Sequence, residues 1–395
     1  MYDFTTVVDR KEHGSSKWKG MQVLNSRVPE GIVPFSVADM ELRNPPEVIA
    51  GLKRCLDEVI LGYSVATPAY QAAVCGWMKR RHNWEIRKDW IVECNGVVPA
   101  LYTAVNAFTE PGDGVIMLTP VYYPFYMAVE QNDRKIVGSG LIERDGRYYI
   151  DFDDLEKKAK DPKNKLVFFC NPHNPVGRVW ERDEIERFGK ICIENGVQVV
   201  SDEIHFDLIM PGYKHVVYST ISSEFGDTAI ICTAPSKTFN LAGMQTSNII
   251  IKNPDIRKRF SAALDKTGFF TLNTLGYAAC EIAYTQCEKW LEELLVVLDR
   301  NRATVEEYMK KHIPQIKVFK LEGTYLQWWD CRGLGMDHKE LEQFMIKDAL
   351  LFLDEGYIFG EQGEGFERIN LACPTETLVQ ALDRLRDALK KRGAI

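Results

Sequence analysis

Five residues with chemically useful side chains or backbones each follow an apolar run of the sequence. They are Gly96 in ECNGVV, Tyr122 in TPVYYPF, Asn174 in CNPHNPVG, Asp202 in VVSDEIH and Lys237 in APSKTFNLAG. Each has an ordinary explanation when taken alone. A lysine in a loop is usually solvated, an aspartate after a strand often caps a helix, and Asn-Pro commonly begins a turn. The five together indicate a more specific chemistry.

The set supplies one partner for each part of a phosphorylated pyridine aldehyde, which is pyridoxal 5′-phosphate (PLP). An amine such as that of Lys237 condenses with the aldehyde, provided that cationic surroundings lower its pKa. The carboxylate of Asp202 can hold the ring nitrogen protonated, so that the ring withdraws electrons. The other parts are matched by donors to the ring oxygen at Asn174 and His205, the aromatic face of Tyr122, and the backbone N–H groups of Gly96, Val97 and Val98 at the start of a helical run.

The elements that must position these residues are apolar strands between residues 90 and 252. Amphipathic stretches separate several of them, which favours a largely parallel sheet covered by helices on both faces. In such a sheet ligands bind beyond the carboxyl ends of the strands, where these residues lie. The expected strands are WIVEC, GVIMLTP, RKIVGSG, KLVFFCNP, VQVVSDE, TAIICTAPSK and SNIIIKN.

The C-terminal part of the chain has a different pattern. Residues 270–311 contain no proline and predict one long helical connector. A strand pair over 317–330, a helix over 337–350, a strand over 366–373 and a helix over 374–391 then predict a smaller α+β unit. We expect an N-terminal segment, 1–45, that packs with the small domain, a large PLP-binding domain, 46–285, and a small C-terminal domain, 286–395.

Composition excludes several classes of protein. The 395 residues are 45% hydrophobic and 27% charged, which is typical of a globular chain, and the net charge of −7 disfavours binding to nucleic acid. The sequence contains neither a CxxC nor an HExxH spacing that would indicate a metal site. The beginning of the sequence lacks the pattern of a secretion signal, and the ten cysteines are scattered. We therefore expect a cytoplasmic protein with free thiols.

Three other features have simpler interpretations. The Gly-rich string GEQGEG at 360–365 is interleaved with glutamates, which repel phosphate, and is predicted to be a loop. Trp328 and Trp329 are expected in the core. The charged run at 156–165 is typical of a solvated helix face.

The spacing of the candidate residues resembles a known family. CNPHNPVG, followed 28 positions after Asn174 by Asp202 and 35 positions later by Lys237, resembles the fold-type I PLP-dependent aminotransferase family. More narrowly, the segments KW, VADM, PPEVIAGL, GYS, TPVYYPF, NPHNPVGRVW and APSKTFNLAG resemble the MalY/PatB cystathionine β-lyase (cysteine-S-conjugate β-lyase) subgroup. The match runs nearly end to end. It implies an α/β fold with a seven-stranded, largely parallel sheet and a smaller α+β domain.

The resemblance also implies roles for residues. Lys237 would bind the cofactor covalently and move protons, Asp202 would pair with the ring nitrogen, and Tyr122 would stack on the ring. Arg368 in GFERINLACP matches the arginine that binds the substrate α-carboxylate through a bidentate fork; the alternative is a surface ion pair. The remaining assignments are Asn174 and His205 at the ring oxygen, Gly96, Val97, Val98 and Ser236 at the phosphate, Asn174 and Ala38 at the substrate, and Tyr63 at the phosphate of the neighbouring subunit of a homodimer.

Two positions depart from the common aminotransferase pattern. His205 stands where many aminotransferases have tyrosine, which matches the β-lyase subgroup. Gln245 stands where many relatives carry a second basic residue for the phosphate. Phosphate binding would then depend more on backbone amides.

The subgroup resemblance implies a carbon–sulfur β-lyase of the cystathionine β-lyase type, acting in sulfur amino-acid metabolism and methionine biosynthesis. Such an enzyme converts L-cystathionine or a related cysteine S-conjugate to a thiol, pyruvate and ammonia. The site residues alone do not decide between this reaction and amino transfer to an α-keto acid. A regulatory protein that retains PLP and binds a transcription factor is a third alternative.

Overall fold

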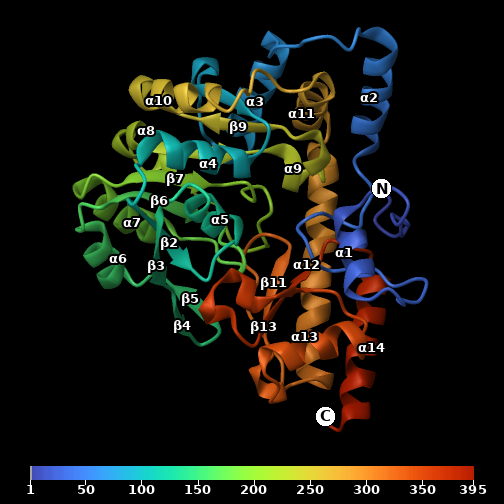
Figure 1. Ribbon diagram of the computed structural model, residues 1–395. Helices are drawn as coiled ribbons and strands as arrows, with labels where there is room; N and C mark the ends of the chain where they lie inside the picture. Colours follow the sequence, from blue (N-terminus) through green and yellow to red (C-terminus); the bar gives the residue numbers. More distant parts are fainter. Residues whose placement is uncertain (1) are drawn as a thin grey trace.

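The computed structural model describes residues 2–395 and is built around a seven-stranded sheet (Figure 1). Its strand order is β1-β9-β8-β7-β6-β2-β3, and only β9 runs antiparallel to its neighbours. The predicted α/β fold with a largely parallel sheet is confirmed, and each of the seven expected runs forms a strand. The strands are β1 (Ile91–Cys94), β2 (Gly114–Thr119), β3 (Lys135–Gly140), β6 (Asn164–Cys170), β7 (Gln198–Asp202), β8 (Ala229–Thr233) and β9 (Ser247–Ile250).

Two hydrophobic cores cover the two faces of this sheet. In β2, Val115 and Met117 belong to one core, whereas Ile116 and Leu118 belong to the other, because successive strand residues point to opposite faces. The first core includes α4 (Val97–Phe108), α5 (Pro124–Glu130) and α10 (Pro254–Asp265). The second includes α3 (Pro68–His82), α6 (Phe152–Ala159), α7 (Arg182–Glu194), α8 (Ser223–Thr228) and α11 (Thr274–Gln286). The sheet is therefore buried on both faces, as its continuous apolar strands predict.

The prediction of one continuous helical connector over residues 270–311 was partly wrong. The chain forms two helices, α11 and α12 (Glu288–His312), because the buried Cys287 leaves helical geometry at φ −108° and ψ 15°. The break lets α11 pack on α2 (Pro46–Glu58) and α3, while α12 runs down the molecule towards α14 (Thr375–Arg392) (Figure 1).

The C-terminal part contains a four-stranded antiparallel sheet. Its order is β10 (Lys317–Val318), β11 (Leu326–Asp330), β13 (Phe366–Asn370) and β12 (Asp354–Glu355), and α13 (His338–Lys347) and α14 accompany it. Trp328 and Trp329 are buried, as predicted. The two-residue strand β12 and the hairpin of β4 (Ile142–Arg144) and β5 (Arg147–Tyr149) were not predicted. Residues 360–365 form one short 3₁₀ turn (Glu361–Gly363) and irregular chain.

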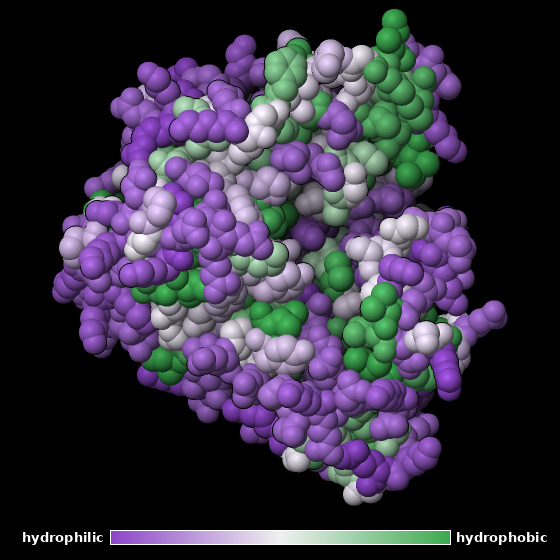
Figure 2. Space-filling view, viewed as in Figure 1, coloured by the Kyte–Doolittle hydropathy of each residue, from purple (hydrophilic) through white to green (hydrophobic). Residues whose placement is uncertain are grey.

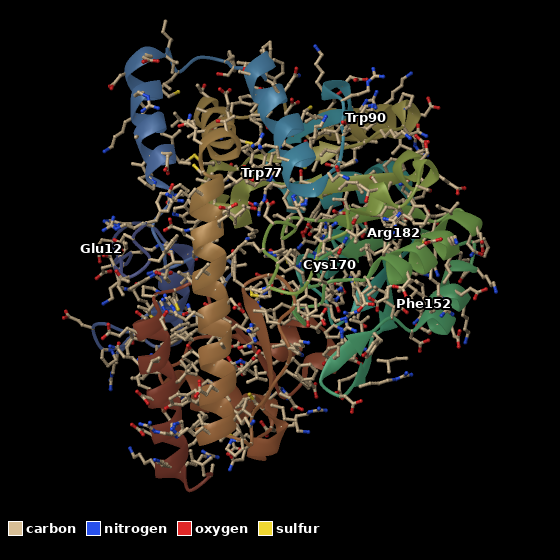
Figure 3. All side chains as sticks on the ribbon, turned by 180° about the vertical axis from the view of Figure 1, so that it is seen from behind. Glu12, Trp77, Trp90, Phe152, Cys170 and Arg182 are labelled. Atoms are coloured by element: carbon tan, nitrogen blue, oxygen red, sulfur yellow. The ribbon has the colours of Figure 1, made fainter. Side chains whose placement is uncertain are left out.

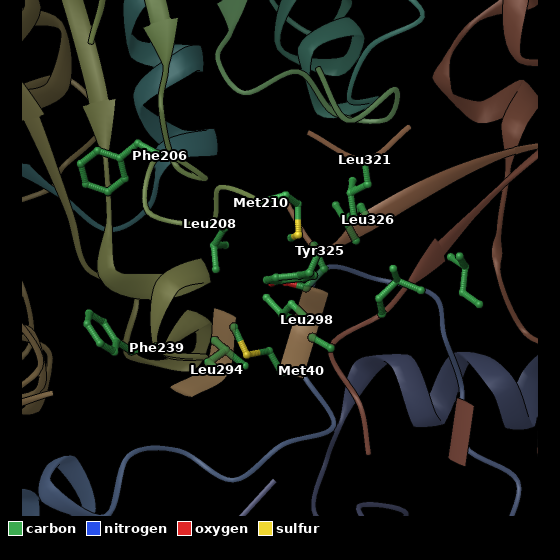
Figure 4. Close-up of a cluster of buried hydrophobic side chains, with 14 of the residues drawn as sticks. Met40, Phe206, Leu208, Met210, Phe239, Leu294, Leu298, Leu321, Tyr325 and Leu326 are labelled. Carbon is green, nitrogen blue, oxygen red and sulfur yellow. The ribbon is translucent and has the colours of Figure 1, made fainter. Parts of the chain in front are cut away.

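The N-terminal segment packs on the C-terminal part. Trp18 and Met21 of α1 (Ser16–Leu24) share a hydrophobic cluster with Ile346 and Phe352. A second cluster joins Met40 to α12, the chain after β7 and the chain before β11 (Figure 4). The domain boundaries at 45 and 285 stay a prediction. No helix within residues 2–395 is long and apolar enough to cross a bilayer, and all ten cysteines are free.

Candidate active site

A cavity of about 190 Å³ lies beyond the carboxyl ends of the parallel strands. Tyr122 follows β2, Asn174 follows β6, Asp202 ends β7 and Lys237 follows β8, so the strand order itself gathers them at one edge of the sheet. The cavity lining contains ten of the twelve predicted site residues: Ala38, Gly96, Val97, Val98, Tyr122, Asn174, Asp202, His205, Ser236 and Lys237. Arg368 and Tyr63 are the two predicted residues outside the lining.

Lys237 belongs to the four-residue helix α9 (Pro235–Thr238), which begins directly after β8. Its Nζ donates a hydrogen bond to the Ala38 carbonyl at 2.8 Å. Burial lowers the lysine pKa to about 8, with the nearby Arg368 charge acting in the same direction and Asp39 and Asp202 opposing it. Cationic surroundings were expected to lower this pKa, but burial is the larger cause.

Burial shifts the pKa of both Asp202 and His205. Burial raises the Asp202 pKa to about 7 although Lys237 and a hydrogen bond from the Ile204 N–H at 3.1 Å oppose the shift. Burial also lowers the His205 pKa well below its usual value, so the imidazole is neutral. The buried His205 Nδ1 has no hydrogen-bond partner within residues 2–395. A bound cation would favour the Asp202 carboxylate, and a ligand could satisfy the imidazole.

The other end of the cavity is suited to an anion. Gly96 precedes α4, a twelve-residue helix with no acidic residue in its first turn, and Val97 and Val98 form that turn. Unpaired N–H groups and the helix dipole favour negative charge at such a position. Gln245 lines the same cavity in a left-handed conformation at φ 48°.

Arg368 lies on β13 and is held from two sides. Its Nη1 donates to Asn174 Oδ1 at 2.8 Å, its Nη2 pairs with Asp354, and its guanidinium lies 4.7 Å from the centre of the Phe359 ring. The residue is 1% exposed, so a surface ion pair is excluded. Nε has no hydrogen-bond partner in the described chain. The guanidinium is therefore fixed beside Asn174, with donor capacity remaining for a carboxylate.

Tyr63 lies apart from the other predicted residues. It follows α2, is 97% exposed and contacts Phe270 edge-on, with 6.2 Å between ring centres. Within one chain, Tyr63 does not meet the cavity.

Several residues at the site were not predicted from the sequence. No sequence pattern marked Asp354, because its strand, β12, is only two residues long. Some missed lining residues adjoin residues that were named, and this adjacency was the available signal. They are Asn95, Pro99, Cys170, Ile204, Ala242, Gln245 (named only as a departure) and Thr246.

The residues present fit PLP. An amine of low pKa, a buried carboxylate, an unsatisfied imidazole nitrogen, an aromatic face and a helix N-terminus surround one cavity. These groups match the aldehyde, ring nitrogen, ring oxygen, ring face and phosphate of that cofactor.

Comparisons with known proteins agree with this geometry. The family model "Aminotransferase class I and II" matches residues 32–385. The cystathionine beta-lyase PatB of Bacillus subtilis is 44% identical over 357 residues, which cover 90% of this chain and 92% of PatB.

Two solved structures are also similar. Cystalysin from Treponema denticola, which contains a PLP cofactor, is 54% identical and has a TM-score of 0.98, with 99% of this chain and 100% of cystalysin covered. The PLP-bound C-S lyase from Staphylococcus hominis is 32% identical, with a TM-score of 0.92 and 98% of each chain covered. The chain therefore belongs to the class I and II aminotransferase family.

Proposed function

We propose that the protein is a PLP-dependent carbon–sulfur β-lyase that cleaves L-cystathionine or related cysteine S-conjugates to a thiol, pyruvate and ammonia. The observation that carries this proposal is one cavity in which Lys237 and Asp202 lie near the Arg368–Asn174 pair. The similarity to PatB and to the Staphylococcus hominis lyase supports β-elimination as the reaction.

Each part of the cofactor has a proposed partner. Lys237 would hold it covalently, Asp202 would accept the ring N–H, and Tyr122 would cover the ring. Asn174 and His205 would bind the ring oxygen. Ser236 and the N–H groups of residues 96–98 would bind the phosphate. When bound, PLP supplies an electron sink that acidifies the substrate Cα–H and allows a β-substituent to leave.

The chain's own groups then orient the substrate and move the proton. Arg368 binds the α-carboxylate, beside Asn174, and so fixes the position of the substrate Cα. Burial lowers the Lys237 pKa to about 8, which is nearer to neutral pH than that of a solvated lysine and suits a general base. Lys237 takes the Cα proton, and the resulting ammonium can return a proton to the departing thiolate. Amino transfer would instead require Lys237 to deliver this proton to a carbon of the cofactor.

A homodimer with shared sites is part of the proposal. Figure 2 shows a hydrophobic patch over α2, and the exposed apolar side chains nearby include Leu56, Ile60, Leu61, Tyr63 and Phe270. Exposed apolar patches of this kind mark association surfaces. In a dimer through this face, Tyr63 would reach the phosphate site of the partner. Cytoplasmic location and a role in methionine biosynthesis stay predictions.

The test uses three substrates in parallel. The purified holoenzyme is incubated with L-cystathionine, with L-cystine, and with L-alanine plus an acceptor keto acid, and pyruvate, thiol and amino-acid products are followed separately. The two sulfur substrates should release pyruvate without any keto acid. Turnover that appears only in the keto-acid mixture would reassign the protein as an aminotransferase.

A further inference from the structure

A buried carboxylate lies behind the helix that carries Lys237. The Asp207 side chain, in the chain that follows β7, has no exposed surface. Trp77 Nε1 donates to its Oδ2 at 3.2 Å, the Thr238 hydroxyl donates to the same oxygen at 2.8 Å, and His82 Nε2 lies 2.9 Å from Oδ1. Asp207 thus connects α3 and α9 to the chain after β7, and three polar contacts offset the cost of burying it.

These contacts join two parts of the candidate active site. Thr238 directly follows Lys237, while Asp207 lies two residues after His205 and five after Asp202. The chain around Asp207 forms a turn, since the Leu208 N–H donates to the His205 carbonyl at 2.9 Å. Asp207 therefore ties the helix of the amine to the segment that bears the predicted ring partners.

Few side-chain hydrogen bonds come from α9 itself, although the next residues, Phe239 and Asn240, accept hydrogen bonds from Asn44 through their carbonyls. The helix is four residues long, and in the part of the chain described here its side chains make two hydrogen bonds: Thr238 to Asp207, and Lys237 itself to Ala38. Once the amine engages a ligand, Thr238 remains as the side-chain anchor of this helix. The Asp207 contact is therefore the side-chain hydrogen bond closest to Lys237 in sequence.

Aromatic side chains enclose this contact. The His82 ring stacks on Phe206 at 4.1 Å, and the Trp77 ring stacks on Tyr284 at 4.9 Å. Phe239, the residue after Thr238, packs edge-on against Trp77 at 5.5 Å. Figure 3 labels Trp77 on α3, and Figure 4 shows Phe206 and Phe239 in the buried cluster. Because water is excluded, these hydrogen bonds have no competing partner and can hold their geometry.

We propose that Asp207 is a positioning residue, which through Thr238 fixes the Lys237 amine relative to Asp202 and His205. This inference rests on the proposed function, because the alignment matters only if Lys237 is the reacting amine. An error of about 1 Å in the placement of a reacting group costs on the order of 100-fold in rate.

The test compares three holoenzyme variants. Thr238→Val keeps the shape of the side chain and removes the hydroxyl, and Thr238→Ser keeps the hydroxyl. Thr109→Val is the matched control, because the buried Thr109 hydroxyl donates to the Val105 carbonyl at 2.6 Å and accepts from Arg134 at the far end of α4.

Each variant is measured for kcat and KM with L-cystathionine and for melting temperature. A further measurement needs no turnover: cofactor-free protein is mixed with PLP, and the growth of the visible band of the lysine-bound cofactor is timed. Thr238→Val should lower kcat about 10- to 100-fold, change KM less than about twofold, and slow the growth of the band. Thr238→Ser should recover most of both rates, and Thr109→Val should lose only melting temperature.

Several outcomes would overturn the inference. They are wild-type kcat and band growth in Thr238→Val, equal losses in Thr109→Val, or no recovery in Thr238→Ser. If the wild-type protein itself forms no band and releases no pyruvate, the proposed function fails instead. Asp207→Asn, if it folds, should share the kcat defect of Thr238→Val, and a folded Asp207→Asn with wild-type kcat would also contradict the proposal.

Discussion

Replacing Lys237 with methionine should stabilise the cofactor-free protein at neutral pH. The lysine pKa falls from 10.5 to about 8 because the side chain is buried at the cavity, so at pH 7 the folded protein carries an ammonium that is poorly solvated. Each unit of pKa corresponds to about 1.4 kcal/mol, which sets an upper limit of about 3 kcal/mol. Water that enters the cavity screens part of this cost, and we expect a gain of about 1–2 kcal/mol for Lys237→Met.

The pH dependence of this stability gain follows from the same pKa shift. Between pH 8 and pH 10.5 the unfolded chain binds more protons at Lys237 than the folded chain does, so the wild-type stability from this group rises with pH. The full cost of burying the Lys237 ammonium is present below pH 8 and is lost as the pH approaches 10.5. The stability difference between Lys237→Met and wild type should therefore shrink across this window.

Urea unfolding of the cofactor-free proteins at pH 7 and pH 10 measures this difference. Lys190→Met is the control, because the Lys190 side chain is exposed and paired with Glu186, and such pairs contribute about 0–1 kcal/mol. A Lys237→Met protein less stable than wild type at pH 7, or a gap that does not narrow at pH 10, would refute the conclusion that burial lowers the lysine pKa.

Three further substitutions test the assigned roles. Asp202→Asn should lower kcat by about 100-fold or more, which is about 3 kcal/mol, while most of the PLP stays bound by absorbance; an unchanged kcat in the fully loaded variant would contradict the role. Arg368→Lys should raise KM about 10- to 100-fold for every amino-acid substrate alike, because one ammonium cannot reproduce a bidentate fork worth roughly 1.5–3 kcal/mol per charged hydrogen bond; kinetics equal to wild type would make Arg368 structural. Tyr63→Phe should weaken PLP retention. Hybrid dimers in which one subunit carries Tyr63→Phe and the other carries Lys237→Ala should contain one site of wild-type affinity and turnover. Hybrids in which every site that keeps Lys237 binds PLP weakly would place Tyr63 in its own chain's site.

The strands of the large sheet could be predicted because they are short apolar runs that end in polar or turn residues. The hairpin of β4 and β5 was missed because its sequence, IERDGRYY, is polar and short. The break at the buried Cys287 was missed because no proline marks it.

The site residues at strand ends could also be predicted, since parallel topology places all such ends on one edge. Residues that act through a partner distant in sequence could not. Asp354 lies 14 residues from Arg368, and Asp207 lies 31 residues from Thr238. The partners in each pair lie on different elements or segments, so only the folded chain brings them together.

The reaction stoichiometry with L-cystathionine tests the central claim most directly. Holoenzyme is supplied with L-cystathionine and no keto acid, and homocysteine, pyruvate and ammonia are measured over many turnovers. A carbon–sulfur β-lyase should release all three in equal amounts until the substrate is consumed. Product that stops after one equivalent per site, or that continues only when a keto acid is added, would contradict the proposed function.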